Sequence, residues 1–156
     1  MNKYRTPEAL RRALEDRLLA SSRGGGGDLP RMRRQVAFDR LLCRLFANAD
    51  APWLLKGGYA MELRIESART TRDIDLALRS MPGGGSQWDD AAVRLLLQNL
   101  ANADLGDGFE FLIGEPTMDL DAAPYGGSRF PVEASMGDRN FASFHVDVSA
   151  GDVLRE

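Results

Sequence analysis

The sequence predicts an α+β protein in which a mixed β-sheet carries helices packed on one face. Three observations carry this prediction. Apolar residues recur at helical spacing in the first third of the chain, apolar and polar residues alternate in several later segments, and Gly- or Pro-rich stretches separate these segments. With 156 residues, of which 44% are hydrophobic and 28% charged, the chain can form one compact domain with a core.

Two helices are expected before residue 50. Thr6 and Pro7 fit an N-cap and a first-turn proline, and leucines at four-residue intervals extend this helix to about Ser22. A glycine run then interrupts the chain, and a second helix is expected over Pro30–Ala47. Its apolar side is formed by Val36, Leu41, Leu42, Leu45 and Phe46.

The middle of the chain predicts strands that alternate with helices. "WLL" (residues 53–55) is typical of a short buried strand leading into "KGG", after which "GYAMELRIE" (58–66) has a helical pattern. Alternation over Asp73–Arg79 predicts a second strand. "WDDAAVRLLLQNLANAD" (88–104) predicts another helix, whose apolar side is Val93, Leu96, Leu97 and Leu100.

The last third of the chain predicts a β meander. Strand-like runs lie at residues 109–114, 129–136 and 141–149, and the segments "APYGGS" and "MGDRN" suit the turns between them. We therefore expect one compact domain overall, in which residues 1–50 form basic N-terminal helices and residues 51–156 form the core.

The composition favours a cytoplasmic protein without membrane association. No apolar run approaches the ~20 residues of a membrane span, and the N-terminus lacks the apolar stretch of a signal peptide. The single cysteine, Cys43, cannot form an internal disulfide, and its apolar neighbourhood "FDRLLCRLF" predicts a buried packing role.

Charge is distributed unevenly along the chain. Residues 1–44 hold 11 Lys+Arg and 5 Asp+Glu, so 11 − 5 = +6, whereas the remainder holds 9 and 18, so 9 − 18 = −9. A basic N-terminal segment followed by an acidic remainder can indicate a protein that binds a polyanionic partner close to a cation-binding centre. A solvated arginine-rich helix surface gives the same totals, so charge alone leaves both interpretations open.

Two aspartates on one face of a predicted strand are the first candidate site. Asp73 and Asp75 would lie about 6.5–7 Å apart and repel each other by roughly 2 kcal/mol at an effective dielectric near 20. A bound Mg²⁺ or Mn²⁺ would relieve this repulsion, because hard divalent cations prefer carboxylate oxygens. Acids on a solvated strand face are the alternative.

Two further segments favour the metal interpretation. In "LLKGGYAMEL", Gly57 and Gly58 would let the backbone approach an anion, and Lys56 offers a compact charge in a chain with only two lysines. In "FHVDVSAGD", the valines flanking Asp147 would face the core and leave its carboxylate on the opposite face. If this strand lies beside the Asp73 strand, three carboxylates could hold two cations about 3.5–4 Å apart.

These segments resemble the AbiEii/AbiGii-type nucleotidyltransferase toxins of the DNA polymerase β-like nucleotidyltransferase superfamily. The resemblance covers roughly residues 30–152 and is carried by "LLKGG", "ELRIESARTTRDIDLAL" and "GSRFPVEASMGDRNFASFHVDVSAGD". It implies a polymerase β-like nucleotidyltransferase core that transfers NMP from an NTP to an acceptor hydroxyl on RNA, such as a tRNA end, or on a protein. It also implies Mg²⁺ (or Mn²⁺) as the cofactor and a cognate antitoxin as a partner.

The resemblance also assigns roles to individual positions. It implies metal binding and catalysis by Asp73, Asp75 and Asp147, with Asp147 as the acid that helps to deprotonate the acceptor. It implies nucleotide binding by Gly57 and Gly58, with Lys56 beside them. We add Tyr59, which follows these glycines, and Arg72, which lies next to the acids, as nucleotide-binding candidates by position.

The sequence departs from the family pattern in two places. Tyr59 stands where relatives usually place a small hydroxyl residue, and the sequence stops at "GDVLRE", where relatives continue into a helical C-terminal half. These departures motivate an alternative, a truncated and catalytically inactive remnant that binds nucleotide or a partner. A plain binding module, in which the acids are surface charge, is the third hypothesis.

Overall fold

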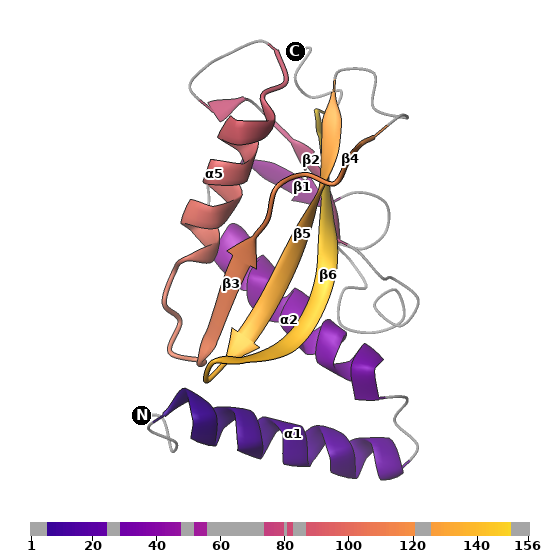
Figure 1. Cartoon of the computed structure of the whole chain (residues 1–156), viewed down its shortest axis with the longest axis vertical. Helices are drawn as coiled ribbons and strands as arrows, with labels where there is room; N and C mark the ends of the chain where they lie inside the picture. Colours follow the sequence, from indigo (N-terminus) through magenta and orange to yellow (C-terminus); the bar gives the residue numbers. More distant parts are fainter. Residues whose placement is uncertain are drawn as a thin grey trace.

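The computed structural model describes residues 6–24, 29–47, 52–55, 74–79, 81–82, 87–120 and 126–150. Helices and strands within these ranges are shown in Figure 1. In chain order they are α1 (Pro7–Arg23), α2 (Leu29–Leu45), β1 (Trp53–Leu55), β2 (Ile74–Leu78), α5 (Asp90–Ala101), β3 (Phe109–Ile113), β4 (Met118–Asp119), β5 (Gly127–Met136) and β6 (Arg139–Ala150). The predicted α+β class is confirmed.

The strands form one mixed sheet. Its order is β1-β2-β6-β5-β3, and β4 pairs with β5 outside this path. β2 and β6 are parallel, whereas the other pairs are antiparallel. β5 and β6 form a hairpin whose turn residues Gly137 and Asp138 both have positive φ (59° and 66°), as a type I′ turn requires. The predicted "MGDRN" turn is therefore present.

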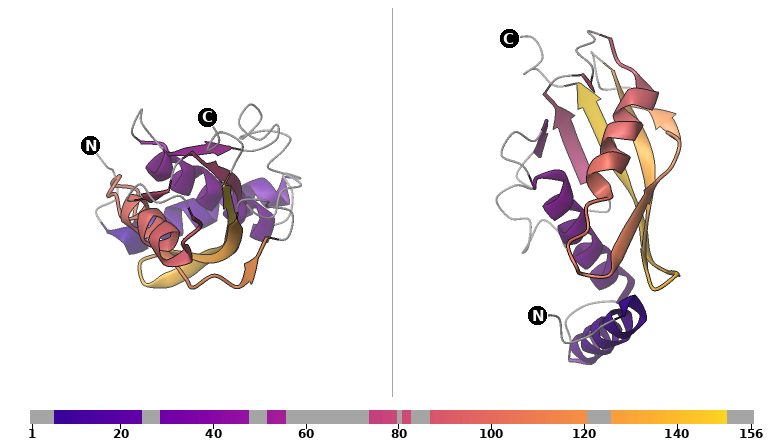
Figure 2. Two further views of the ribbon diagram at one scale, coloured as in Figure 1. Left: turned by 90° about the horizontal axis from the view of Figure 1, so that it is seen from above. Right: turned by 90° about the vertical axis from the view of Figure 1, so that its left-hand side faces the viewer.

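Helices α2 and α5 pack on one face of the curved sheet (Figure 2). Phe38 of α2 meets Phe144 of β6 edge-on, with ring centroids 4.8 Å apart. Val93 and Leu97 of α5 are fully buried in the same apolar cluster. This one-sided packing explains why the strands alternate between buried and more exposed residues.

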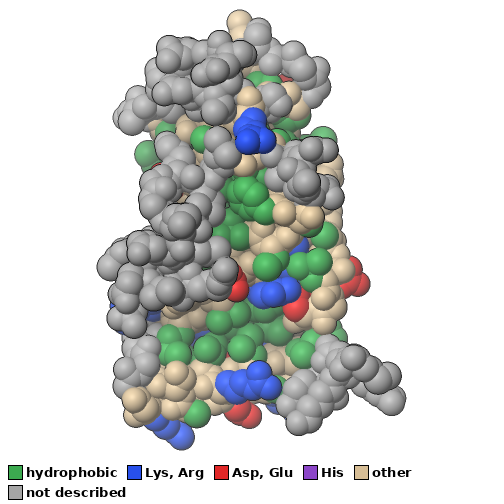
Figure 3. Space-filling model, turned by 180° about the vertical axis from the view of Figure 1, so that it is seen from behind, with side chains coloured by type: hydrophobic (Ala, Val, Ile, Leu, Met, Phe, Trp, Pro, Cys, Tyr) green, Lys and Arg blue, Asp and Glu red, His purple; other side chains and the backbone are tan. Residues whose placement is uncertain are grey.

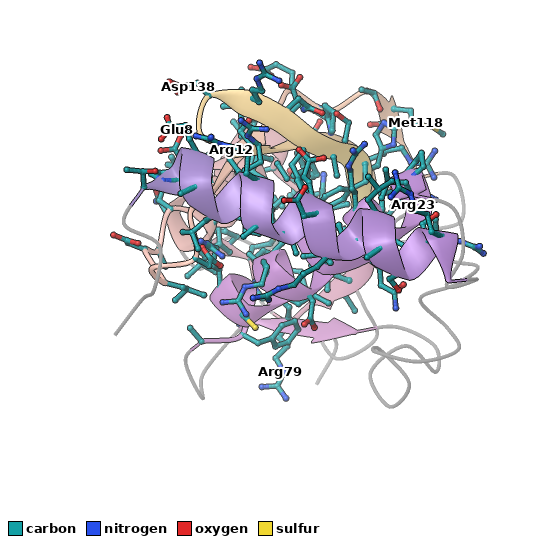
Figure 4. All side chains as sticks on the ribbon, turned by 90° about the horizontal axis from the view of Figure 1, so that it is seen from below. Glu8, Arg12, Arg23, Arg79, Met118 and Asp138 are labelled. Atoms are coloured by element: carbon teal, nitrogen blue, oxygen red, sulfur yellow. The ribbon has the colours of Figure 1, made fainter. Side chains whose placement is uncertain are left out.

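Helix α1 lies across the end of the β5–β6 hairpin (Figure 1). The Thr6 hydroxyl accepts a hydrogen bond from the Ala9 N–H at 3.1 Å, as an N-cap does. Glu8 and Asp138 lie at the same end of the molecule in Figure 4. A Cβ on Gly137 would stand 3.0 Å from the Glu8 backbone nitrogen, so the turn needs glycine for close approach as well as for its φ.

The inward-facing side of α2 differs from the prediction at two adjacent positions. Leu41, Leu42 and Leu45 are buried as expected, but Cys43 is exposed, so its predicted packing role is wrong. The reason is helical period: Cys43 lies two residues from both Leu41 and Leu45, which turns it to the opposite side. The Arg44 side chain is buried instead, with 1% exposure.

Arg44 and Arg40 hold Asp107, which precedes β3. We call these three residues the Asp107 clip. The Arg44 Nη2 atom donates to Asp107 Oδ1 at 2.7 Å, its Nη1 donates to Oδ2 at 3.0 Å, and Arg40 Nε donates to Oδ2 at 2.7 Å. Burial raises the pKa of Asp107, but hydrogen bonds from Arg44, Arg40 and the Phe109 N–H outweigh it and lower the pKa from 3.8 to about 2.

Strand β3 ends the sheet, and α5 satisfies its outer edge. The Gln98 side chain donates to the Phe111 carbonyl and accepts from the Ile113 N–H, both at 2.8 Å, as a neighbouring strand would. Arg94 Nε donates to the Ile113 carbonyl at 3.1 Å. These bonds close an edge that could otherwise pair with another chain.

Other expectations differ in detail or lie beyond the described ranges. The short strand β4 is not predicted by the sequence, because two residues give no periodicity. The expected helix at 58–66 lies outside the described residues. No helix in the described part of the chain combines the length and apolar character that a membrane span needs.

Hydrophobic side chains gather along the described surface on the side opposite to Figure 1 (Figure 3).

Candidate active site

Two acids from distant parts of the sequence meet on neighbouring strands. Asp75 of β2 and Asp147 of β6 are direct partners in the parallel pair. Paired residues of adjacent strands point to the same face of a sheet. The two carboxylates therefore lie on the same face, although 72 positions separate them along the chain (147 − 75 = 72).

The core fixes the direction of both aspartates. Ile74 and Leu76 flank Asp75, and all of the side chain surface of these neighbours is buried. Val146 and Val148 flank Asp147 and are equally buried. Because successive strand residues point to opposite faces, burial of these four neighbours turns both carboxylates away from the core. Asp75 is exposed, and the Asp147 side chain retains 16% exposure.

Arg129 extends the row of paired residues onto the third strand. It lies opposite Asp147 in the antiparallel β5–β6 pair. Arg129 Nε donates to Asp147 Oδ1 at 2.7 Å, and Nη2 donates to Oδ2 at 3.0 Å. This is the two-pronged geometry of a strong arginine–carboxylate pair. We call these two residues the Asp147 clip.

The other predicted site residues lie outside the described ranges. They are Lys56, Gly57, Gly58, Tyr59, Arg72 and Asp73. Asp73 immediately precedes Ile74, the first residue of β2. Of the sequence-predicted site, the described structure thus brings together Asp75 and Asp147.

The donor set at this position fits a hard divalent cation. Neighbouring strands run about 4.8 Å apart, so in-register carboxylates can both reach an ion that takes oxygen ligands at about 2.0–2.1 Å. Within the described ranges, no cluster of three or more His, Cys, Asp or Glu side chains is found. The fit to a metal therefore depends on Asp75 and Asp147 here, with Asp73 next in sequence to β2.

A cavity of about 650 Å³ adjoins the Asp147 clip. Arg34 of α2, Arg129 of β5 and His145 of β6 are among its lining residues. The Arg34 Nε atom is buried and has no hydrogen-bond partner within the described residues. A larger cavity of about 730 Å³ lies between α5 and β3, and its described lining contains neither candidate acid. The described lining of the smaller cavity likewise contains neither acid, and this cavity adjoins the site through Arg129, the hydrogen-bond partner of Asp147.

Sequence reasoning did not single out Arg129. The signal was present, because Arg129 precedes the alternating residues of a predicted strand, on the side of that strand opposite to Phe130 and Val132. What the sequence lacked was the register that sets Arg129 against Asp147. His145, two residues before Asp147 on β6, lines the cavity as a neighbour of this row.

Comparison with known protein families gives one match. The family model described as "Nucleotidyl transferase AbiEii toxin, Type IV TA system" matches residues 40–156, about three quarters of the chain. This range includes the segments that hold Asp75, Arg129 and Asp147. A search of curated proteins finds no match.

Proposed function

The chain belongs to the AbiEii nucleotidyl transferase toxin family, and from this premise we propose that it is a metal-dependent nucleotidyltransferase. It transfers NMP from an NTP to the hydroxyl of an acceptor, with release of pyrophosphate. The acceptor is RNA, with a tRNA end as one form, or a protein side chain. Family membership in a type IV toxin–antitoxin system implies a nucleotide substrate and an antitoxin partner.

The observation that supports this proposal most directly is the pairing of Asp75 with Asp147. Nucleotidyl transfer needs carboxylates that converge on one point, because charge builds up on the attacking and leaving oxygens together. The parallel β2–β6 pair supplies such convergence from two distant segments, and the buried neighbours hold both side chains outward.

We assign metal binding to Asp73, Asp75 and Asp147, with Mg²⁺ or Mn²⁺ as the ion. When bound, the ion neutralises charge on the phosphates and makes the acceptor hydroxyl more acidic. Asp147 takes the proton of the acceptor hydroxyl. Lys56, Gly57 and Gly58 hold the triphosphate, and Tyr59 and Arg72 border it.

The test uses the purified chain with labelled NTPs, Mg²⁺ and total RNA. The expected result is label on RNA or protein that Asp75→Asn reduces by about a thousandfold, since loss of a metal-binding carboxylate removes transition-state stabilisation. Asp119→Asn on β4 is the matched control, because Asp119 is an exposed strand aspartate outside the site. Labelling that survives Asp75→Asn at full rate would show that the acids are wrongly assigned.

A further inference from the structure

Both oxygens of the Asp147 carboxylate are already engaged by protein. Arg129 Nε binds Oδ1 and Arg129 Nη2 binds Oδ2, at 2.7 and 3.0 Å. A divalent cation binds a carboxylate through these same oxygens. It also repels a guanidinium that stays within contact distance. Arg129 and a metal ion are therefore competitors for Asp147.

The surroundings of Arg129 would allow its side chain to move away from Asp147. Its side chain is 32% exposed, and it lines the cavity of about 650 Å³ beside the sheet. The side chain of Arg44, which holds Asp107, is by contrast only 1% exposed. A guanidinium at the border of a cavity can rotate without leaving a buried charge unpaired.

We propose that Arg129 is a positioning residue that holds Asp147 in the metal-free protein and yields it to the divalent cation. In this state the guanidinium neutralises Asp147 and keeps its carboxylate in the row with Asp75. On metal binding the side chain turns into the adjoining cavity. This inference rests on the proposed function in one respect only, namely that Asp147 is a metal ligand.

The test is a Mn²⁺ titration by calorimetry on the wild type and four variants, with metal-free melting as a folding check. Arg129→Gln removes the competing charge, so its Mn²⁺ Kd should fall about three- to tenfold, the range expected for a partly exposed ion pair. Arg129→Lys keeps the charge but loses the fork, so its Kd should lie between those of Arg129→Gln and the wild type.

Arg94→Gln is the matched control. Arg94 also pairs with a carboxylate, that of Glu115 at 3.2 Å, and is similarly exposed, but it lies on α5 away from the candidate acids. Its Mn²⁺ Kd should equal that of the wild type. The double variant Arg129→Gln/Asp147→Asn should lose the gain in affinity, because the freed carboxylate is then absent.

Several outcomes overturn the proposal. An unchanged or weaker Mn²⁺ affinity in Arg129→Gln does so, as does a gain that persists without Asp147, or an absence of binding in all variants. If Arg129→Gln fails to fold, an unchanged Kd in Arg129→Lys has the same force. Asp75-dependent RNA labelling in the transfer assay tests the proposed function separately, so either conclusion can fail while the other stands.

Discussion

Two aspartates of this protein are bound by arginine side chains in a two-pronged geometry, and their surroundings distinguish a structural pair from the candidate site. Asp107 and Asp147 have the same side-chain exposure, 16%. Within the described residues, Asp107 is bound by two arginines and a backbone N–H, and one of these arginines is fully buried. Asp147 is bound by one arginine that is 32% exposed, and it has Asp75 beside it.

The exposed fraction of the carboxylate is the same for both aspartates and therefore does not distinguish them. The groups that bind each carboxylate do. In the Asp107 clip, Arg44 also donates to the carbonyls of Arg40, Ala103 and Phe109. Movement of its side chain would therefore remove the hydrogen-bond donor of all three carbonyls. In the Asp147 clip, the arginine borders a cavity. The first set of bonds joins α2 to the segment that precedes β3, and the second is the one for which we propose an exchange of partners.

The largest expected effect comes from breaking the Asp107 clip. Arg44→Met should lower the free energy of unfolding by about 3–5 kcal/mol, because Asp107 would lose its buried partner and three carbonyls their donor. Urea denaturation followed by circular dichroism measures this loss. Arg139→Met, at an exposed position on β6, should change stability by less than about 0.5 kcal/mol. Equal losses in the two variants would contradict a structural role for the clip.

Acid should weaken the Asp107 clip in a defined pH range. The pKa of Asp107 is lowered from 3.8 to about 2, so its stabilisation is complete above pH 4 and is lost as pH falls toward 2. The shift corresponds to about 2 kcal/mol. Denaturation at a series of pH values should show this slope in the wild type and a shallower one in Asp107→Asn. The same slope in both proteins would assign acid sensitivity to other groups.

Removing the outer arginine of the Asp107 clip should cost less. Arg40 is 32% exposed and makes one bond to Asp107 Oδ2. Arg40→Gln should lower the free energy of unfolding by about 1 kcal/mol, since Arg44 still binds both oxygens. Urea midpoints compare it with Arg44→Met. A loss as large as that of Arg44→Met would mean that the burial of each arginine does not determine how much it contributes to the free energy of unfolding.

The smallest effect on stability is expected at the Asp147 clip. Arg129→Gln should change the metal-free unfolding free energy by less than about 1 kcal/mol, because Arg129 is partly exposed and water screens its charge. Thermal melting without divalent ions measures this. A loss of several kcal/mol would make this clip structural, like that of Asp107, and would remove the contrast between the two.

The strands and their faces were predictable, whereas the row of charges was not. Alternation places Val146 and Val148 inward and Asp147 outward, as observed. The turn at residues 137–138 alone would pair Arg129 with Val146, because Met136 pairs with Arg139. A bulge between Ala134 and Ser135 shifts the register by one residue and brings Arg129 opposite Asp147. At the bulge two residues of β6 lie opposite one residue of β5. Each β5 residue before the bulge therefore pairs with a β6 residue one position further along the chain.

The sequence by itself determined where helices and strands form and which face each strand buries, because these follow from the spacing of apolar residues along a few turns or pleats. It also carried the motifs of the family. Only the tertiary structure decided that β6 lies parallel to β2, that Asp75 meets Asp147, and that Arg44 is buried against Asp107. Those outcomes depend on contacts between residues far apart in the chain, and local periodicity holds no information about such partners.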